Sequence, residues 1–213
     1  MAAPASTPPT GEPPLAQTLN GELTGRVVTV EPLSAEHEAG LLAAATDADM
    51  FAWMPVDMAS SEAALRAWLQ TSLDNARAGR EVPFTIRAAG SGRVLGSTRF
   101  LELRPEHRRA EIGWTWVTRD AWGTGVNVET KLLLLGRAFE HAGLRRVEFK
   151  TDARNERSRA ALLALGATFE GVLRKHMVVR DGGARDSAYF SVIDDEWPEV
   201  RRRLQSRLAA RAG

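Results

Sequence analysis

Two glycines lie where a strand-like segment gives way to a helix-like one. Gly123 and Gly125 follow residues 109–117, which have the pattern of a strand, and a long helical pattern begins at Gly125. The first turn of a helix presents unpaired N–H groups and a partial positive charge, and a residue without Cβ lets a ligand's oxygens approach the backbone. The backbone of residues 123–127 is therefore a candidate cradle for a pyrophosphate.

The spacing of this turn differs from that of two common phosphate-binding patterns. A P-loop has four residues between its glycines, followed by Lys and Ser or Thr, and a dinucleotide-binding turn has a third glycine. Residues 123–131 contain neither pattern. A Gly-x-Gly turn is also an ordinary strand-to-helix connection, so by itself it leaves the phosphate-binding and the purely structural interpretations equally open.

The elements that position this turn follow from apolar periodicity and from capping residues. The sequence predicts strands at residues 26–31, 82–87, 94–101, 109–117, 146–151, 168–179 and 186–193, and helices after Ser34, after Ser60 or Ser61, from Gly125 to Phe139, from Asn155 to Leu165, and after Asp194 or Asp195. An antiparallel meander is followed by alternating helices and strands. This order indicates a mixed α+β domain.

Length and composition set the domain organisation. The chain has 213 residues with 44% hydrophobic content, which suits a single globular domain, and we place that domain at residues 21–213. It ends in a basic amphipathic helix. Residues 1–20 contain five prolines among small residues, a composition that predicts a disordered tail.

Charge and cysteine content exclude several functions. Lys and Arg total 28 against 27 Asp and Glu, a formal net charge of +1, so no overall field favours a nucleic acid or an anionic membrane as partner. The lack of cysteine excludes disulfides, thiolate metal sites and a cysteine nucleophile. We expect no bound metal, because the sequence has no ligand cluster. Without an apolar run of spanning length or a secretory signal, we expect a cytoplasmic protein.

Four signatures occur in a fixed order and spacing. They are Glu111-Ile-Gly-Trp114, Arg119-x-x-x-Gly123-x-Gly125, Asn155-x-x-Ser158 and Leu165-Gly-Ala-x-x-Glu170-Gly171. Through them the chain, from about Leu23 to Arg203, resembles the GNAT superfamily of acetyltransferases and is most similar to its Rim-type branch of ribosomal-protein N-acetyltransferases. The resemblance implies a GNAT fold, with a central, mostly antiparallel, seven-stranded sheet flanked by helices. Its fourth and fifth strands splay apart, and the exposed backbone would pair with the pantetheine arm of a coenzyme.

The same resemblance implies a reaction. It predicts an N-acetyltransferase that takes acetyl-CoA (coenzyme A carrying the acetyl group) as co-substrate and passes the acetyl group to a primary amine of a peptide or a small molecule. The amine would attack the thioester directly in a ternary complex. Because the acyl donor is already activated, positioning supplies most of the rate. The oligomeric state is left open, with a homodimer as one option.

The family's coenzyme contacts map onto the glycine turn and the start of the following short helix. The corresponding residues are Val117, Arg119, Gly123, Thr124, Gly125, Val126, Asn127, Asn155 and Ser158. The backbone N–H near Val117 would donate to the acetyl carbonyl oxygen. Asn155 is also a suitable helix cap without any ligand. Asn127 departs from the family, in which a small residue is commoner at this position.

The group that usually protonates the departing thiolate is missing. Many relatives carry a tyrosine seven residues after Asn155, where this chain has Leu162. Rim-type relatives carry a serine at the position of Ser158, so its hydroxyl, or a water that it orients, is the natural substitute. The missing tyrosine leaves a non-catalytic acyl-CoA-binding module as an alternative function.

The acceptor amine needs a base, because an aliphatic amine with a pKa of about 10 is almost wholly protonated at neutral pH. Glu111 aligns with the glutamate that serves as base in protein-acetylating relatives, and we assign it that role. The structural alternative is an ion pair between Glu111 and Arg108 or Arg109. Asp152 and His176 are reserve candidates.

Aromatic and basic residues suggest further sites. Trp53, Trp114, His176 and Tyr189 are candidates for an acceptor pocket, although tryptophans commonly serve core packing. The C-terminal arginines leave a nucleic-acid-binding or partner-binding protein as another alternative. A basic face opposite an apolar helix stripe is, however, usually a solvated face.

Overall fold

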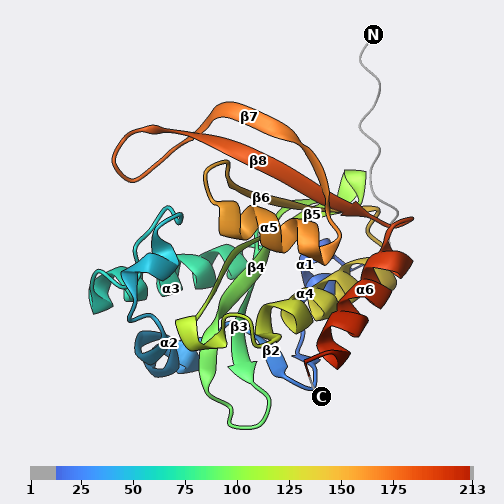
Figure 1. Ribbon diagram of the computed structural model, residues 1–213. Coiled ribbons are helices and arrows are strands. Elements are labelled where there is room, and N and C mark those ends of the chain that lie inside the picture. The colour runs from blue at the N-terminus through green and yellow to red at the C-terminus, as the bar shows by residue number, and fades with distance from the viewer. Residues whose placement is uncertain (1–12, 212–213) are drawn as a thin grey trace.

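The computed structural model describes residues 13–211, and within them eight strands form one sheet (Figure 1). In spatial order the strands are β1 (Leu23–Thr24), β2 (Val28–Pro32), β3 (Val82–Ala88), β4 (Val94–Arg104), β5 (Arg109–Val117), β6 (Arg146–Asp152), β8 (Ala184–Ile193) and β7 (Thr168–Val178). All neighbouring strands are antiparallel except β5 and β6, which run parallel. The predicted mixed fold with a mostly antiparallel sheet is confirmed.

Two features of the N-terminal region differ from the prediction. The sheet has eight strands instead of seven, because β1 pairs with β2 over only two residues, too few to show an alternating pattern. A short helix, α1 (Leu15–Leu19), lies inside the segment predicted to be a disordered tail. Leu19 is fully buried in the main core, so the predicted boundary at residue 20 is wrong for this helix. Residues 1–12 lie outside the described part of the chain.

Further helices flank the sheet. They are α2 (Glu38–Ala44), α3 (Glu62–Arg77), α4 (Val126–Gly136), α5 (Glu156–Leu165) and α6 (Trp197–Ala209), with a π-helical turn (Arg137–His141) extending α4 and 3-10 turns at Ala35–His37, Ala48–Phe51, Pro105–His107 and Arg119–Ala121. The predicted caps begin two of the helices: Ser61 Oγ accepts the Ala64 N–H in α3, and Asn155 Oδ1 accepts the Ser158 N–H in α5, each at 3.1 Å. No helix in residues 13–211 is long and apolar enough to cross a bilayer.

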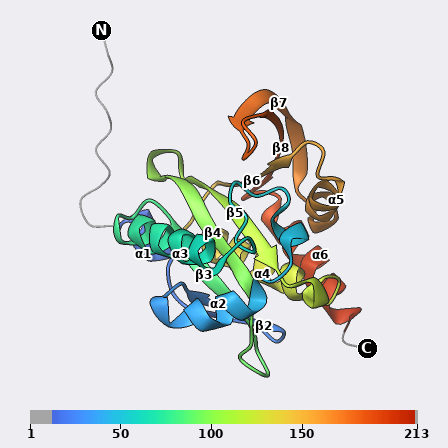
Figure 2. The same ribbon diagram turned by 90° about the vertical axis from the view of Figure 1, so that its left-hand side faces the viewer.

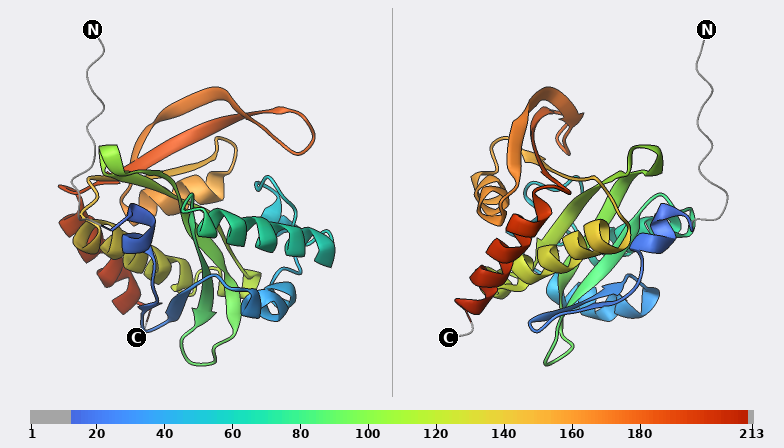
Figure 3. Two further views of the ribbon diagram at one scale, coloured as in Figure 1. Left: turned by 180° about the vertical axis from the view of Figure 1, so that it is seen from behind. Right: turned by 90° about the vertical axis from the view of Figure 1, so that its right-hand side faces the viewer.

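Helices cover both faces of the sheet. One core cluster joins α4 to the sheet and contains Phe84, Phe100 and Leu134, whereas a second joins α2 and α3 to the opposite face and contains Leu41 and Trp68. Figure 3 shows α4 and α6 side by side, in agreement with their mutual contacts. This packing fixes the start of α4 beside the end of β5.

The strands β7 and β8 form a long hairpin that extends beyond the rest of the sheet (Figure 1). Its turn reaches the segment between α2 and α3. There Arg180 Nη2 donates to the Phe51 carbonyl oxygen at 3.2 Å, and Nη1 lies 3.4 Å from Asp57 Oδ2. The hairpin therefore closes over one end of the molecule.

The sheet separates into two parts between β5 and β6 (Figure 2). These strands pair only through residues 109–111 and 146–148 and then diverge. They are the fourth and fifth strands counted from residue 26, so the predicted splay is confirmed. Opposite β4, the strand β5 also carries a bulge at Trp114, whose φ of 51° lies in the left-handed region.

Candidate active site

The end of β5 turns one backbone amide toward the splay. Thr118 N–H donates to the Leu95 carbonyl oxygen of β4 at 2.7 Å. Successive amides of a strand point to opposite sides, so the Val117 N–H points away from β4 and toward the gap. The Val117 carbonyl oxygen is held by Trp122 Nε1 at 3.0 Å. The gap thus exposes a hydrogen-bond donor to any extended ligand that enters it.

The first turn of α4 supplies further donors. Gly125 precedes the helix with a φ of 104°, a conformation that glycine adopts without the cost a Cβ would bring. Among residues 13–211, the N–H groups of Val126, Asn127 and Val128 have no acceptor, and the helix hydrogen bonds begin at Glu129 N–H to the Gly125 oxygen. A Cβ on Gly123 would meet no atom within 4 Å. This open turn suits a diphosphate.

Two arginines lie beside this turn, and only one of them lines the cavity. Arg119, predicted to contact the coenzyme, is bound by Asp47 and Asp49 at 2.5 and 2.6 Å and does not line the cavity. Arg157 does line the cavity, and its guanidinium lies 3.5 Å from the ring centroid of Trp122. Within the described residues it has no carboxylate partner. Sequence reasoning missed Arg157, whose only signal was its place two residues after Asn155.

The start of α5 faces the same cavity. Asn155 is buried and caps the helix, and both it and Ser158 line the cavity. The cap and the ligand-facing interpretations of Asn155 are therefore compatible. Leu162, at the position of the missing tyrosine, also lines the cavity. Thr124 instead donates to the Ala121 carbonyl oxygen at 2.7 Å and lies outside the lining.

One cavity of about 540 Å³ joins these groups through the splay. Its walls come from β5, β6, α4 and α5. Its lining contains Gly123, Asn127 and the start of α5, although not Gly125 or Val126. It also contains Glu111, Lys150 and Arg185. The cavity is continuous from the donors that suit a diphosphate to a group of charged side chains on the far side.

Glu111 has a different partner from either one considered in the sequence. Its carboxylate is 3% exposed and accepts from Lys150 Nζ at 2.9 Å, across the splay. Arg109 binds Glu148 at 2.8 Å, and Arg108 binds the Gly143 carbonyl oxygen. Burial raises the pKa of Glu111, whereas the Lys150 charge opposes the rise. A buried carboxylate of raised pKa is suited to accept a proton.

The reserve bases are less well placed. Arg154 binds the Asp152 carboxylate at 3.0 and 2.8 Å, and these bonds lower the Asp152 pKa. His176 lies 3.1 Å from Ser187 Oγ and 3.4 Å from the Tyr189 hydroxyl, and burial lowers its pKa.

The predicted acceptor-pocket residues fall into two pairs. Trp53 and Trp114 line the cavity, whereas His176 and Tyr189 do not.

A buried lysine in the cavity wall was also missed. Lys131 of α4 is 5% exposed, and its Nζ donates to Thr115 Oγ1 at 2.8 Å. Burial lowers the pKa of its amine to about 7. In the sequence this residue occupies an apolar helix face, and only that position could have drawn attention to it.

The described residues contain no group of three or more His, Cys, Asp or Glu side chains arranged to hold a metal ion. The donors of this site are instead backbone amides, hydroxyls and cationic side chains. Such donors suit an anionic organic ligand rather than a metal ion.

Comparisons with known proteins agree with this geometry. The family model "Acetyltransferase (GNAT) domain" matches residues 28–168. The N-acetyltransferase YoaA of Bacillus subtilis (strain 168), named as uncharacterized, is 30% identical over 114 residues, which cover 54% of this chain and 63% of YoaA.

Two solved structures are similar along most of the chain. An acetyltransferase structure from T. thermophilus is 40% identical, with a TM-score of 0.80, over 88% of this chain and 96% of that one. RimJ of Mycobacterium smegmatis, in complex with CoA-disulfide, is 26% identical, with a TM-score of 0.73, over 90% of this chain and 94% of that one. The chain thus belongs to the GNAT family of acetyltransferases, with relatives in its Rim-type branch, and is an acyltransferase.

Proposed function

We propose that this enzyme transfers the acetyl group of acetyl-CoA to a primary amine by direct attack in a ternary complex. The observation that carries the proposal is the coincidence, in one cavity, of the splay and the unpaired amides of α4. The splay suits the pantetheine arm and the amides suit the diphosphate. The RimJ structure, which is a complex with CoA-disulfide, supports coenzyme A as the ligand.

Different residues of the cavity carry out the two proton transfers of the reaction. Glu111 accepts the proton of the amine, directly or through water, since only the neutral nitrogen attacks. The C–N bond forms while the C–S bond breaks, and the Val117 N–H donates to the carbonyl oxygen as negative charge develops there. Ser158, or a water that it orients, returns a proton to the thiolate.

Turnover tests this proposal directly. Release of coenzyme A thiol from acetyl-CoA is measured against panels of free amino acids, polyamines, aminoglycosides and peptides. Amine-dependent release is the expected result. A protein that binds coenzyme A without releasing thiol with any amine would instead be the non-catalytic acyl-CoA-binding module. Leu162, which replaces the usual acid, is the observation that favours this second candidate.

The C-terminal helix gives less support to a nucleic-acid partner. Arg201 is paired with Glu140, Arg202 with Glu199, and Arg207 Nη1 donates to the Ala164 carbonyl oxygen at 2.7 Å. Arg201 and Arg207 thus hold α6 against the rest of the domain, whereas the Arg202 pair lies within α6. Nucleic-acid binding that weakens steeply with salt would be the result that supports this alternative.

A further inference from the structure

Arg185 of β8 is a buried cation without a protein partner. Its side chain is 7% exposed, and among residues 13–211 no carboxylate or hydrogen-bond acceptor contacts its guanidinium. The other buried arginine, Arg99, differs, because it pairs with Glu81 at 2.6 Å and bonds Ser72 at 3.0 Å. The Nε of Arg185 is fully buried without an acceptor, which is costly unless a ligand satisfies this donor.

The charged groups around Arg185 include no carboxylate that is bound to it. The nearby carboxylates are those of Asp152 and Glu111. Each is already bound by another cation, Asp152 by Arg154 and Glu111 by Lys150. Three cations therefore face these two carboxylates, with Asp181 and Asp186 adding negative charge near Arg154, and the cation that no carboxylate binds is the buried one. This part of the cavity is consequently suited to one additional negative charge.

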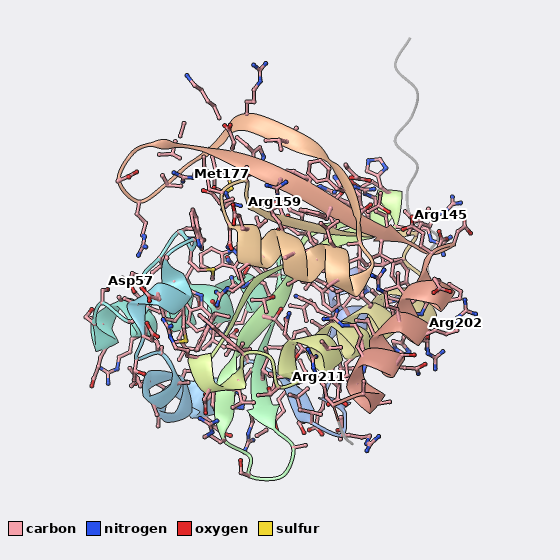
Figure 4. All side chains as sticks on the ribbon, in the orientation of Figure 1. Asp57, Arg145, Arg159, Met177, Arg202 and Arg211 are labelled. Carbon is pink, nitrogen blue, oxygen red and sulfur yellow. The ribbon has the colours of Figure 1, made fainter. Side chains whose placement is uncertain are left out.

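Arg185 lies where the acceptor would enter. It lines both the main cavity, which also contains Glu111, and a neighbouring cavity of about 240 Å³ below the β7–β8 hairpin. Figure 4 shows Met177 on the hairpin above the segment that contains Asp57. Arg180, which contacts Asp57 and the Phe51 oxygen, forms one side of the neighbouring cavity. The small volume of this neighbouring cavity favours a small molecule over a polypeptide chain.

Apart from Arg185, the residues that line both cavities are apolar. Trp53, Met54, Pro55 and Met177 contribute to both cavities. Thioether and aromatic side chains favour an apolar group on the ligand. The entrance thus combines one unmatched guanidinium with an apolar wall.

We propose that the amine acceptor is a free amino acid with an apolar side chain, whose carboxylate binds Arg185 while its amine faces Glu111. This inference rests on the proposed function and names the acceptor for the same site. A carboxylate offers two oxygens to the planar guanidinium fork, and such paired hydrogen bonds fix orientation. Attack by the nitrogen forms the amide, the C–S bond breaks, and the amine proton passes to Glu111. The carboxylate itself does not react.

Binding provides the first test. Leucine, phenylalanine and methionine are titrated calorimetrically, beside their amides and decarboxylated amines, into the protein saturated with coenzyme A and into the protein alone. At least one free amino acid should bind about 30-fold or more tightly than its two matched partners, as expected for a buried charge pair. Equal affinity within every matched set would overturn the proposal.

Variants of Arg185 provide the second test. Arg185→Gln should remove the preference for the carboxylate in both affinity and kcat/KM, whereas Arg185→Lys should keep part of it. The control is Arg174→Gln, an exposed arginine of β7 without a described partner, which should change nothing. A preference that survives in Arg185→Gln would contradict the assignment. Should Arg185→Gln fail to fold, the wild-type titrations and Arg185→Lys still decide the matter.

Two outcomes separate this inference from the proposed function. Decarboxylated amines, or peptides that begin with the same residue, could be acetylated at rates equal to those of the amino acids. This result would contradict the proposed acceptor but not the proposed acetyl transfer. Amino acids that bind through Arg185 without any thiol release would instead contradict the proposed reaction and support the binding site.

Discussion

At the scale of single residues, the pair formed by Glu111 and Lys150 makes the proposed base testable. We expect Glu111→Gln to lower kcat by about 100-fold or more, the usual contribution of a general base, and to leave coenzyme A affinity nearly unchanged. The ratio of wild-type to Glu111→Gln kcat/KM should rise with pH through the raised pKa of Glu111, because both enzymes share the titration of the amine. Kinetics over a pH series measure this ratio.

A variant of Lys150 distinguishes a base at Glu111 from a structural role, because only a base would make the pH dependence of the rate follow the Glu111 pKa. Its charge holds the Glu111 pKa down against burial, so Lys150→Met should move the acidic limb of the rate to higher pH. Glu106→Gln, at an exposed carboxylate, is the control. Full activity of Glu111→Gln with the true amine would assign the base to Asp152, His176 or water.

Lys131 predicts a pH-dependent stability. Its amine has a pKa of about 7 in the folded protein, below the ordinary 10.5, so between these values the unfolded chain binds more protons and stability rises with pH. Below about pH 7 both states bind the proton, and the cost of burying the charge is fully present. Lys131→Met should therefore raise the unfolding free energy by about 2 kcal/mol or more near pH 6, and by less near pH 9.5.

Denaturant unfolding of both proteins at the two pH values measures this difference. The exposed lysine of β7, replaced in Lys175→Met, provides the control. Equal effects of Lys131→Met at both pH values would show that the amine is protonated throughout.

More of the residues of the candidate site could be predicted from the sequence than of the contacts that these residues make. Helix-start physics predicts the glycine turn, whereas the resemblance to the family implies the roles of Asn155 and Ser158. The Lys150 partner of Glu111 was not, because it arises from strands that pair over only three residues. The resemblance implies a coenzyme contact for Arg119, but its side chain is bound by Asp47 and Asp49, which are distant in the sequence.

At the scale of elements, the start of α4 can be tested without disturbing the backbone. Gly125→Asp would combine the effect of the added charge with a change in the backbone and its packing. The φ of 104° strains any side chain, and a Cβ there would contact Leu208 at 3.5 Å. Asn127 lies in the first turn, lines the cavity and has an ordinary helical backbone. It is the better position at which to add a negative charge.

We expect Asn127→Asp to weaken coenzyme A binding by about 10-fold or more, by repulsion of the diphosphate, while thermal stability stays equal or rises slightly. An acidic residue in the first turn favours the helix, so the two effects have opposite signs. Calorimetric titration and thermal unfolding measure them, with Asn127→Ala as the uncharged control. Unchanged affinity in Asn127→Asp would move the diphosphate away from α4.

Element prediction succeeded where apolar periodicity and caps were both present, as at α3 and α5. It missed α1 and β1 because each is stabilised by distant partners. Leu19 is buried in the main core, and the carboxylate of Glu129 on α4 accepts the N–H groups of Arg26, Val27 and Val28 in the turn after β1. Prolines near residue 14 favoured a tail on composition alone, yet proline is well tolerated at a helix start.

At the scale of the whole molecule, the sheet consists of two parts joined by a short parallel pairing. The part from β1 to β5 carries α2, α3 and α4, and the part from β6 to β8 carries α5. The cavity lies along their junction and receives residues from both. A ligand that fills the cavity contacts both parts at once, and its binding should therefore stabilise both parts against unfolding.

We expect coenzyme A to protect the protein against thermal unfolding. At a concentration of about 100 times Kd the stabilisation is about 2.7 kcal/mol, which raises Tm by about 5–10 °C for a chain of this size. Hydrogen exchange should slow at the Val117 amide and in the first turn of α4, since these N–H groups have no acceptor among the described residues. In α2, on the opposite face, exchange should slow only at amides that exchange through global unfolding. Protection without slowing at Val117 would place the coenzyme elsewhere, and no rise in Tm at millimolar coenzyme A would refute the proposed co-substrate.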